Sequence, residues 1–447
     1  MISTAFSPAS DQHNNMNILL SIVLTAGLAA SPEGPVALTN ARIVTVTGET
    51  IERGTLVMED DIIIALGVDV DIPQGAQIID CSGLTVYPGF IDTGTQLGLV
   101  EVGSLPETRD SRELGDLSPQ MKALTAVNPN GVAIPVTRIS GVTTVLTEPS
   151  GGMLPGQAAL INLHGYTPAQ MYAGFEAMTL SFPATGRRGR FDPRSDEDIE
   201  KASKEALKKL NDTFDSAELY HRIDSTYQVN PEQGRRPEYV PSIDALLPVV
   251  RGEQTLIIRV NAAKDILAAL EWVDSRDLER VIFTGLLEGW RVADKIAEAG
   301  IPCLVGPVLS VPTRDSDRYD KAYRNVSLMH AAGVKVAIRS GETENARNLP
   351  YNAGFAAAYG LGVKEALRAV TIVPAEIFGV ADRRGSLEVG KEATLFVSDG
   401  DPFETKTQIH HVFIAGYRIP MESRHTRLYE EFLNRDPSLN KHGEGQQ

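Results

Sequence analysis

Short apolar segments alternate with stretches of helical periodicity through the middle of the chain. The apolar segments are rich in Val, Ile and Leu and are bounded by glycine or polar residues, which predicts β-strands. They occupy residues 86–98, 141–147, 157–163, 177–182, 256–260, 281–284, 301–305 and 334–339. Strands that alternate with helices are typical of a (β/α)8 barrel, whose chemistry takes place at the carboxyl ends of the strands.

A long, charged stretch, residues 187–240, separates the fourth predicted strand from the fifth. Part of it is predicted to be an amphipathic helix, because apolar residues recur in it at helical spacing. These residues are Ile199, Ala202, Ala206, Leu210, Phe214 and Ala217.

The two ends of the chain have a different pattern. Residues 36–46 and 55–66 alternate between apolar and polar positions, with Gly48 and Gly54 as interruptions, and residues 409–419 do the same near the other end. Each segment is predicted to be one strand.

Several motifs resemble the amidohydrolase superfamily, in its imidazolonepropionase-like branch. Pro88-Gly89-Phe90-Ile91-Asp92, followed by a small residue, resembles the first barrel strand of that family. Asn40-Ala41-Arg42-Ile43-Val44 resembles the first strand of the β-sandwich that flanks such barrels, and residues 385–397 resemble the return of the chain into that sandwich.

The resemblance implies an α/β protein in which a (β/α)8 TIM-like barrel is inserted in a small β-sandwich domain formed by both chain ends. The expected domains are an N-terminal extension with a signal peptide (1–31), a composite β-sandwich (32–86 plus 385–421), the barrel (87–384) and a C-terminal tail (422–447).

The family's metal ligands are replaced in this chain. The family has His-x-His after strand one, a Lys or Glu after strand four, a His after each of strands five and six, and an Asp after strand eight. The corresponding positions after strands one, five, six and eight hold Gly94, Gln96, Arg259, Thr284 and Gly341. None of these side chains is an imidazole or a carboxylate, so we expect no catalytic metal and no cofactor.

Other polar residues near the predicted strand ends could still form a site. The candidates for catalysis are Glu148, Arg259 and Arg339. The candidates for ligand binding are Gln96, Glu101, Gln157, Arg259, Asn261, Thr284, Arg339, Ser340 and Glu342.

Strand alternation places Arg339 on the same face as position 341, toward the barrel axis and toward Arg259. Two buried guanidinium groups need a negative partner, because an unpaired buried charge costs several kcal/mol. One alternative is an internal plug, in which Glu101, Glu148 or Glu342 fills the vacated site. The other is an anionic ligand that the arginines hold bidentately.

Composition and the N-terminus narrow the possible partners and location. The formal net charge of -16 and the absence of a basic run argue against nucleic acid. Cys81 and Cys303 are expected to be buried rather than paired. The apolar run at residues 18–28, followed by Ala29-Ala30-Ser31, is typical of a signal peptide. We therefore expect an exported, periplasmic protein with no membrane span in its mature chain.

The leading hypothesis is an exported, non-catalytic relative of amidohydrolases. It would bind a small anionic ligand, or support an active amidohydrolase in a homo- or hetero-oligomer. The alternative is a hydrolase that cleaves amide, cyclic amide or dipeptide C–N bonds without a metal, with Glu148 as base and arginines as oxyanion stabilisers. A purely structural envelope protein is the third class.

Overall fold

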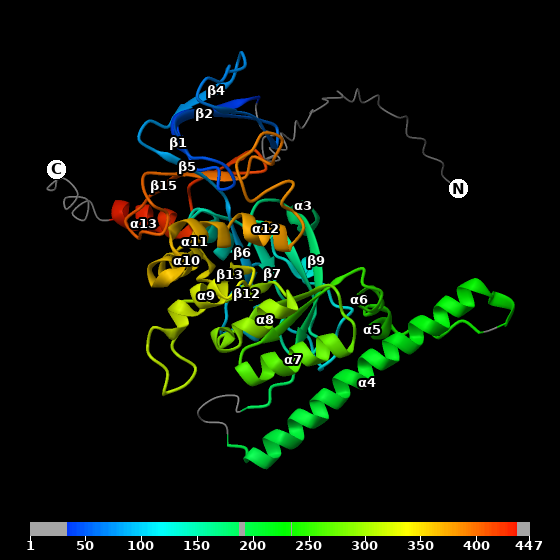
Figure 1. Ribbon diagram of the computed structural model, residues 1–447. Helices are drawn as coiled ribbons and strands as arrows, with labels where there is room; N and C mark the ends of the chain where they lie inside the picture. Colours follow the sequence, from blue (N-terminus) through cyan, green and yellow to red (C-terminus); the bar gives the residue numbers. More distant parts are fainter. Residues whose placement is uncertain (1–33, 187–192, 234, 436–447) are drawn as a thin grey trace, which may run out of the picture.

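The computed structural model describes residues 34–186, 193–233 and 235–435, which form two eight-stranded sheets and their surrounding helices. Figure 1 shows the first sheet, in blue and orange, above the second, which is built from the middle of the chain. The apolar run predicted to be a signal peptide lies outside the described residues.

The first sheet joins the two ends of the chain. β14 pairs antiparallel with β5, so strands from opposite ends lie side by side. Their buried side chains, which include Leu38, Ile43, Leu395 and Phe413, form one apolar cluster. The sheet order is β16-β15-β14-β5-β1-β2-β3, with β4 paired to β1. The strands are β1 (Val36–Ile43), β2 (Ile51–Glu59), β3 (Ile62–Gly67), β4 (Gln77–Asp80), β5 (Thr85–Pro88), β14 (Leu395–Ser398), β15 (Ile409–Ile414) and β16 (Tyr417–Ile419).

Two segments predicted as single strands are hairpins instead. Residues 55–66 span β2 and β3, with a turn at Asp60, whose φ is 53°. Residues 409–419 span β15 and β16, with a turn at Ala415 and Gly416, where φ is 49° and 78°. The successive positive φ angles at Ala415 and Gly416 match the tight turn of a two-residue hairpin. The apolar pattern resumes after each turn, which explains why the sequence pattern predicted one strand.

The second sheet is a nearly closed barrel with the strand order β13-β12-β11-β10-β9-β8-β7-β6. Its outermost strands approach each other where Gly341 N donates to Gly94 O at 3.1 Å and Thr93 Oγ1 donates to Ile338 O at 3.1 Å. The strands are β6 (Phe90–Thr95), β7 (Val142–Thr147), β8 (Gly156–Asn162), β9 (Tyr172–Ser181), β10 (Thr255–Val260), β11 (Val281–Gly285), β12 (Cys303–Val305) and β13 (Val336–Ile338). All eight predicted barrel strands are therefore present.

One barrel strand runs opposite to the direction expected for an all-parallel (β/α)8 barrel. β8 is antiparallel to both β7 and β9, whereas the other neighbouring strands of the barrel are parallel. Its start at Gly156 is therefore near the end of β7, and its end at Asn162 is near the start of β7. We call the end of the barrel that carries the carboxyl ends of the parallel strands the upper end, and the opposite end the lower end.

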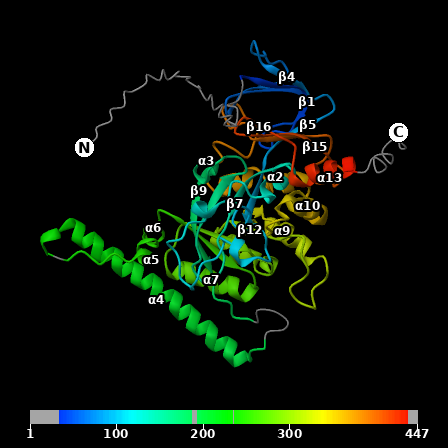
Figure 2. The same ribbon diagram turned by 180° about the vertical axis from the view of Figure 1, so that it is seen from behind.

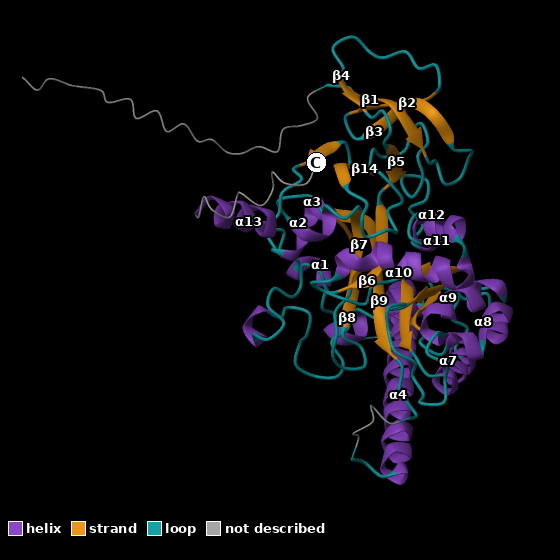
Figure 3. Cartoon of the chain, turned by 90° about the vertical axis from the view of Figure 1, so that its left-hand side faces the viewer, coloured by secondary structure: helices purple, strands orange, loops and turns teal. Residues whose placement is uncertain are grey.

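Helices surround the barrel (Figures 1 and 3). The longer ones after strand β10 are α7 (Ala263–Ser275), α8 (Ala293–Ala299), α9 (Lys321–Ala331), α10 (Leu349–Ala356), α11 (Val363–Ala369) and α12 (Ile372–Ile377). The shorter ones and the last helix are α1 (Ala123–Ala126), α2 (Ala133–Arg138), α3 (Pro168–Met171), α5 (Pro241–Asp244), α6 (Leu247–Val250) and α13 (Arg424–Arg435).

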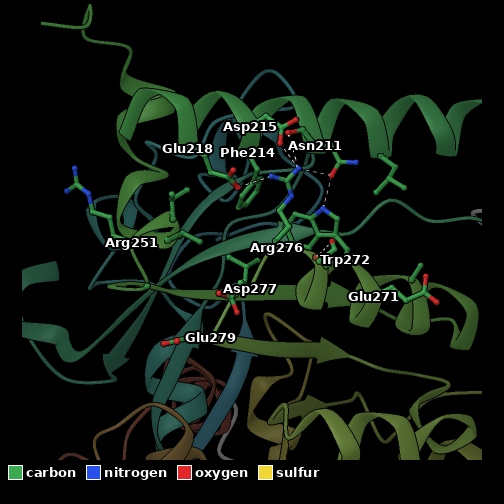
Figure 4. Close-up of a pocket in the computed structure, with 17 residues that line it drawn as sticks. Asn211, Phe214, Asp215, Glu218, Arg251, Glu271, Trp272, Arg276, Asp277 and Glu279 are labelled. Atoms are coloured by element: carbon green, nitrogen blue, oxygen red, sulfur yellow. Dashed lines mark hydrogen bonds and ion pairs between the residues drawn. The ribbon is translucent and has the colours of Figure 1, made fainter. Parts of the chain in front are cut away.

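The predicted amphipathic helix is α4 (Asp196–Val229), and one of its ends extends away from the barrel (Figures 1 and 2). Ser195 caps its first turn by accepting a hydrogen bond from Asp198 N. Phe214 packs edge-to-face on Trp272 of α7 at 5.1 Å. Arg276, at the end of α7, pairs with Asp215 and Glu218 of α4 (Figure 4). These contacts hold the helix against the barrel.

Both cysteines, Cys81 and Cys303, are buried and unpaired, as expected. A search of the described residues for a helix long and apolar enough to cross a membrane finds none.

The turn at Gly416 tests how the two chain ends depend on each other. A Cβ there would lie 1.7 Å from Asp60 O, in the turn between β2 and β3. We expect Gly416→Ala to lower the free energy of unfolding by about 1–3 kcal/mol more than Gly390→Ala. Gly390 is the matched control, because its φ is also positive (92°) but its Cβ would meet nothing within 4 Å. Equal losses in urea titrations of the two variants would contradict this contact between the chain ends.

Candidate functional site

A buried carboxylate lies between two arginines at the upper end of the barrel. Glu148 follows β7, Arg259 belongs to β10, and Arg339 follows β13. Arg339 donates from Nη1 to Glu148 Oε1 at 3.3 Å and from Nη2 to Oε2 at 3.1 Å, a bidentate pair. Arg259 Nη2 also donates to Glu148 Oε2. Strand alternation placed Arg339 toward Arg259, which stands at a former ligand position of the family, and the two side chains do meet at one carboxylate, that of Glu148.

The three side chains differ in burial. Arg339 is 5% exposed and Glu148 2%, whereas Arg259 is 42% exposed. Glu148 raises the pKa of Arg259, burial and Arg339 lower it, and the net direction is downward. This direction is expected when two guanidinium groups share one carboxylate. Arg259 therefore has charge and donors beyond those that Glu148 uses, since a guanidinium carries five N–H groups.

Neighbouring residues fix the position of Arg339. Its Nη1 also donates to Thr284 Oγ1 of β11. The guanidinium lies against Gly94 of β6, where a Cβ would be 2.5 Å from Arg339 Cζ. Arg339 thus occupies the space in which any larger side chain at position 94 would start.

Asp92 supports this arrangement, although the sequence analysis did not select it. It is fully buried at the upper part of β6, and its Oδ1 accepts from Ser340 N at 3.0 Å and from Gly94 N at 3.2 Å. Ser340 Oγ donates to its other oxygen. Burial raises the pKa of Asp92 to about 6, against the lowering effect of these hydrogen bonds. Asp92 belongs to the sequence motif of the first barrel strand, two residues before the former ligand position at Gly94.

A small cavity of about 140 Å³ opens beside the ion pairs. Arg259, Glu148 and Thr284 line it together with residues of the loop after β7, such as Ser150 and Gly151. Its size suits a small anion or a few waters rather than a drug-sized ligand.

The other candidates lie elsewhere or have structural partners. Glu101 accepts from Asn128 Nδ2 at 3.1 Å and from Val132 N at 3.2 Å, so it binds a loop and not the arginines. Gln157 pairs with Gln254 Nε2 at 3.2 Å. Ser340 is bound to Asp92, as described above. Gln96 is half-buried, and Asn261 and Glu342 are exposed. Within the described ranges, none of these side chains forms a hydrogen bond or an ion pair with Arg259 or Arg339.

The direction of β8 also decides where His164 lies. His164 follows the third barrel strand, whose carboxyl end would be at the upper end if all eight strands were parallel. Because β8 is antiparallel, His164 lies at the lower end: Leu163 N donates to Thr143 O, near the start of β7, at 2.8 Å.

The residues present do not fit the family's catalytic metal. Within residues 34–186, 193–233 and 235–435, no group of three or more His, Cys, Asp or Glu side chains is placed to hold a metal ion. At the former ligand positions, Arg259 and the guanidinium of Arg339 bring positive charge, and Gly94 and Gly341 bring no donor side chain. A dication in this space would meet two cations and one carboxylate.

Comparisons with known proteins agree on the fold. The sequence model of the amidohydrolase family matches residues 291–419 of this chain. The chain is 25% identical over 430 residues to imidazolonepropionase from Sphingopyxis alaskensis. The alignment covers 87% of this chain and 96% of that protein. It is 21% identical over 390 residues to amidohydrolase tasK from Hapsidospora irregularis. That alignment covers 82% of this chain but only 39% of that protein.

A solved structure, an amidohydrolase from Thermotoga maritima MSB8, superposes with a TM-score of 0.76 at 23% identity, over 86% of this chain and 99% of that one. The motifs at both chain ends, the barrel and these similarities lead to one conclusion: the chain is similar in sequence motifs and in fold to the amidohydrolase superfamily, in its imidazolonepropionase-like branch.

Proposed function

We propose that this protein is a non-catalytic member of its superfamily, which uses the vacated metal site to bind a small anion at Arg259. The observation that carries the proposal is the Glu148 carboxylate shared between Arg259 and Arg339. One carboxylate satisfies the buried Arg339 through a bidentate pair. The half-exposed Arg259 keeps donors for a ligand in the adjoining cavity.

This proposal combines the two alternatives for the arginines. Arg339 with Glu148 acts as a plug, since both side chains are buried and paired. Arg259 acts as the ligand-binding group, because its pairing with Glu148 leaves part of its guanidinium exposed. A carboxylate or a phosphate has the planar or clustered oxygens that a guanidinium recognises.

Hydrolysis without a metal has less support from the geometry. A general base must come within hydrogen-bond reach of the proton it abstracts. Glu148 is 2% exposed, and both of its oxygens accept hydrogen bonds from arginines. The role of supporting an active relative in an oligomer, and export to the periplasm, stay predictions that rest on the sequence.

We expect succinate and inorganic phosphate to raise the melting temperature of the wild-type protein and to have no effect on Arg259→Gln. The unliganded variant should lose only about 1–2 kcal/mol, since the lost bond is charge-assisted but partly screened by solvent. Differential scanning fluorimetry gives the shifts, and urea titration gives the unliganded stability.

The matched control is Arg347→Gln, which removes an exposed arginine outside the site and should keep the ligand-induced shift. If neither anion stabilises the wild type, the binding role fails. If purified protein hydrolyses lactams or dipeptides and Glu148→Gln abolishes that activity, the non-catalytic role fails.

The close approach of Arg339 to Gly94 gives a second test. Gly94→Ala should cost about 1–3 kcal/mol in the wild type, because Arg339 is held by Glu148 and Thr284 and cannot move aside freely. In an Arg339→Ala background the same change should cost much less, so the two effects should not add. Urea titrations of the four proteins measure this coupling.

Gly186→Ala serves as the control, since a Cβ there meets nothing within 4 Å; its effect should be the same in both backgrounds. Additive effects of Gly94→Ala and Arg339→Ala would mean that the guanidinium does not fill the former ligand position.

A further inference from the structure

A second, larger cavity lies where the first sheet meets the lower end of the barrel. We call it the junction cavity; its volume is about 550 Å³. Its walls come from α2, from the turn after β8, and from β15 and β16 with the turn between them. It is separate from the Glu148 site, because His164 and Arg138 lie near the start of β7 whereas Glu148 follows its end. Its volume is in the range of small-molecule sites.

The junction cavity carries positive charge without a matching carboxylate. Arg138 and Arg418 line it, and none of its lining residues is Asp or Glu. This is unusual for a chain that has 58 acidic and 42 basic residues. The cavity is therefore a local exception to the acidic surface and would attract anions.

The guanidinium of Arg138 uses only part of its hydrogen-bonding capacity. Arg138 stands at the end of α2, and its Nη1 donates to Leu163 O at 3.3 Å. Its Nε is buried and has no hydrogen-bond partner among the residues that the structure describes. Burial lowers the pKa of Arg138, and no carboxylate of the described residues forms an ion pair with it. A half-buried guanidinium in this state is stabilised when an anion enters its surroundings.

Aromatic and apolar surface lies beside this charge. The rings of His164 and Tyr417 are in contact, with centroids 4.8 Å apart, and Tyr166 lines the same cavity. Ile134 and Phe413, both buried, add apolar surface. Burial and Arg138 lower the pKa of His164, so its ring is neutral at pH 7 and supplies flat surface and hydrogen bonding rather than charge.

We propose that the junction cavity binds an aromatic carboxylate, with its carboxylate on Arg138 and Arg418 and its ring against His164, Tyr417 and Ile134. The positive charge of the two arginines favours an anionic ligand, because no carboxylate lines the cavity. The aromatic side chains favour a ligand that has a flat ring. The site is independent of the anion site at Arg259, which accommodates only a small ligand.

Isothermal titration calorimetry with indole-3-acetate, naphthalene-1-carboxylate and 3-phenylpropionate tests the proposal on the full chain. At least one of them should bind saturably at millimolar concentration or below. The amide of the best binder has nearly the same shape without the charge and should bind roughly tenfold more weakly or worse, as expected for the loss of a charge-assisted contact. Arg138→Gln should weaken the acid to a similar degree, and Arg138→Lys less.

Three controls make the result specific. Arg418 is exposed, so Arg418→Gln should fold normally and still weaken binding of the acid. Arg259→Gln should leave binding of the aromatic acid unchanged, and Arg138→Gln should leave the response to succinate unchanged. Equal binding of acid and amide, unchanged binding in both Arg138→Gln and Arg418→Gln, or no saturable binding of any of the three acids would overturn the proposal.

Discussion

The upper end of the barrel depends on the pairing of two guanidinium groups with one carboxylate. Arg339 is buried, so it requires a negative partner, and Glu148 supplies it through two hydrogen bonds. The requirement extends to residues that carry no charge. Gly94 leaves the space that the guanidinium occupies, and Thr284 accepts one of its hydrogen bonds. A buried arginine at this end of the barrel thus depends on several positions, which lie on four different strands or at their ends.

A similar solution is present at the lower end of the barrel. Arg384 is buried there and donates to Asn162 Oδ1 at 2.7 Å and to Glu392 Oε2 at 2.6 Å. Asn162 ends β8, and Glu392 lies on the segment that returns the chain to the first sheet. This arginine therefore ties the barrel to the first sheet. Among the described residues, no carboxylate pairs with the neighbouring Arg138, and this contrast is what makes the junction cavity a candidate site.

Much of the fold followed from the sequence, because apolar runs and glycines mark strands and turns well. The positions of the eight barrel strands and of α4 were predicted, and so was the inward direction of Arg259 and Arg339. The direction of β8 was not predicted, because hydrophobic periodicity does not distinguish parallel from antiparallel strands. Loop length carried that information: residues 148–155 are too few for the crossover that a parallel pair needs. The short loop before β8 also implies that His164, which follows β8, lies at the lower end of the barrel.

The site was predicted only in part, because its residues are far apart in the sequence and meet only in the folded structure. The sequence offered three carboxylates as possible partners of the two arginines: Glu101, Glu148 and Glu342. The three-dimensional structure brings Glu148 into contact with them, whereas Glu101 binds a loop. The supporting role of Asp92 depends on backbone groups of Gly94 and Ser340, which leave no mark in the sequence. The junction cavity joins α2 to strands from the far end of the chain, so no local pattern could reveal it.

We propose that arginine side chains fill the space in which relatives of this chain are expected to hold a metal. The most direct measurement is the zinc content of protein purified from zinc-supplemented cells, determined by mass spectrometry and compared between wild type and Glu148→Gln. We expect far less than one zinc per chain in both proteins. Near-equimolar zinc in the wild type, lost in Glu148→Gln, would contradict this proposal.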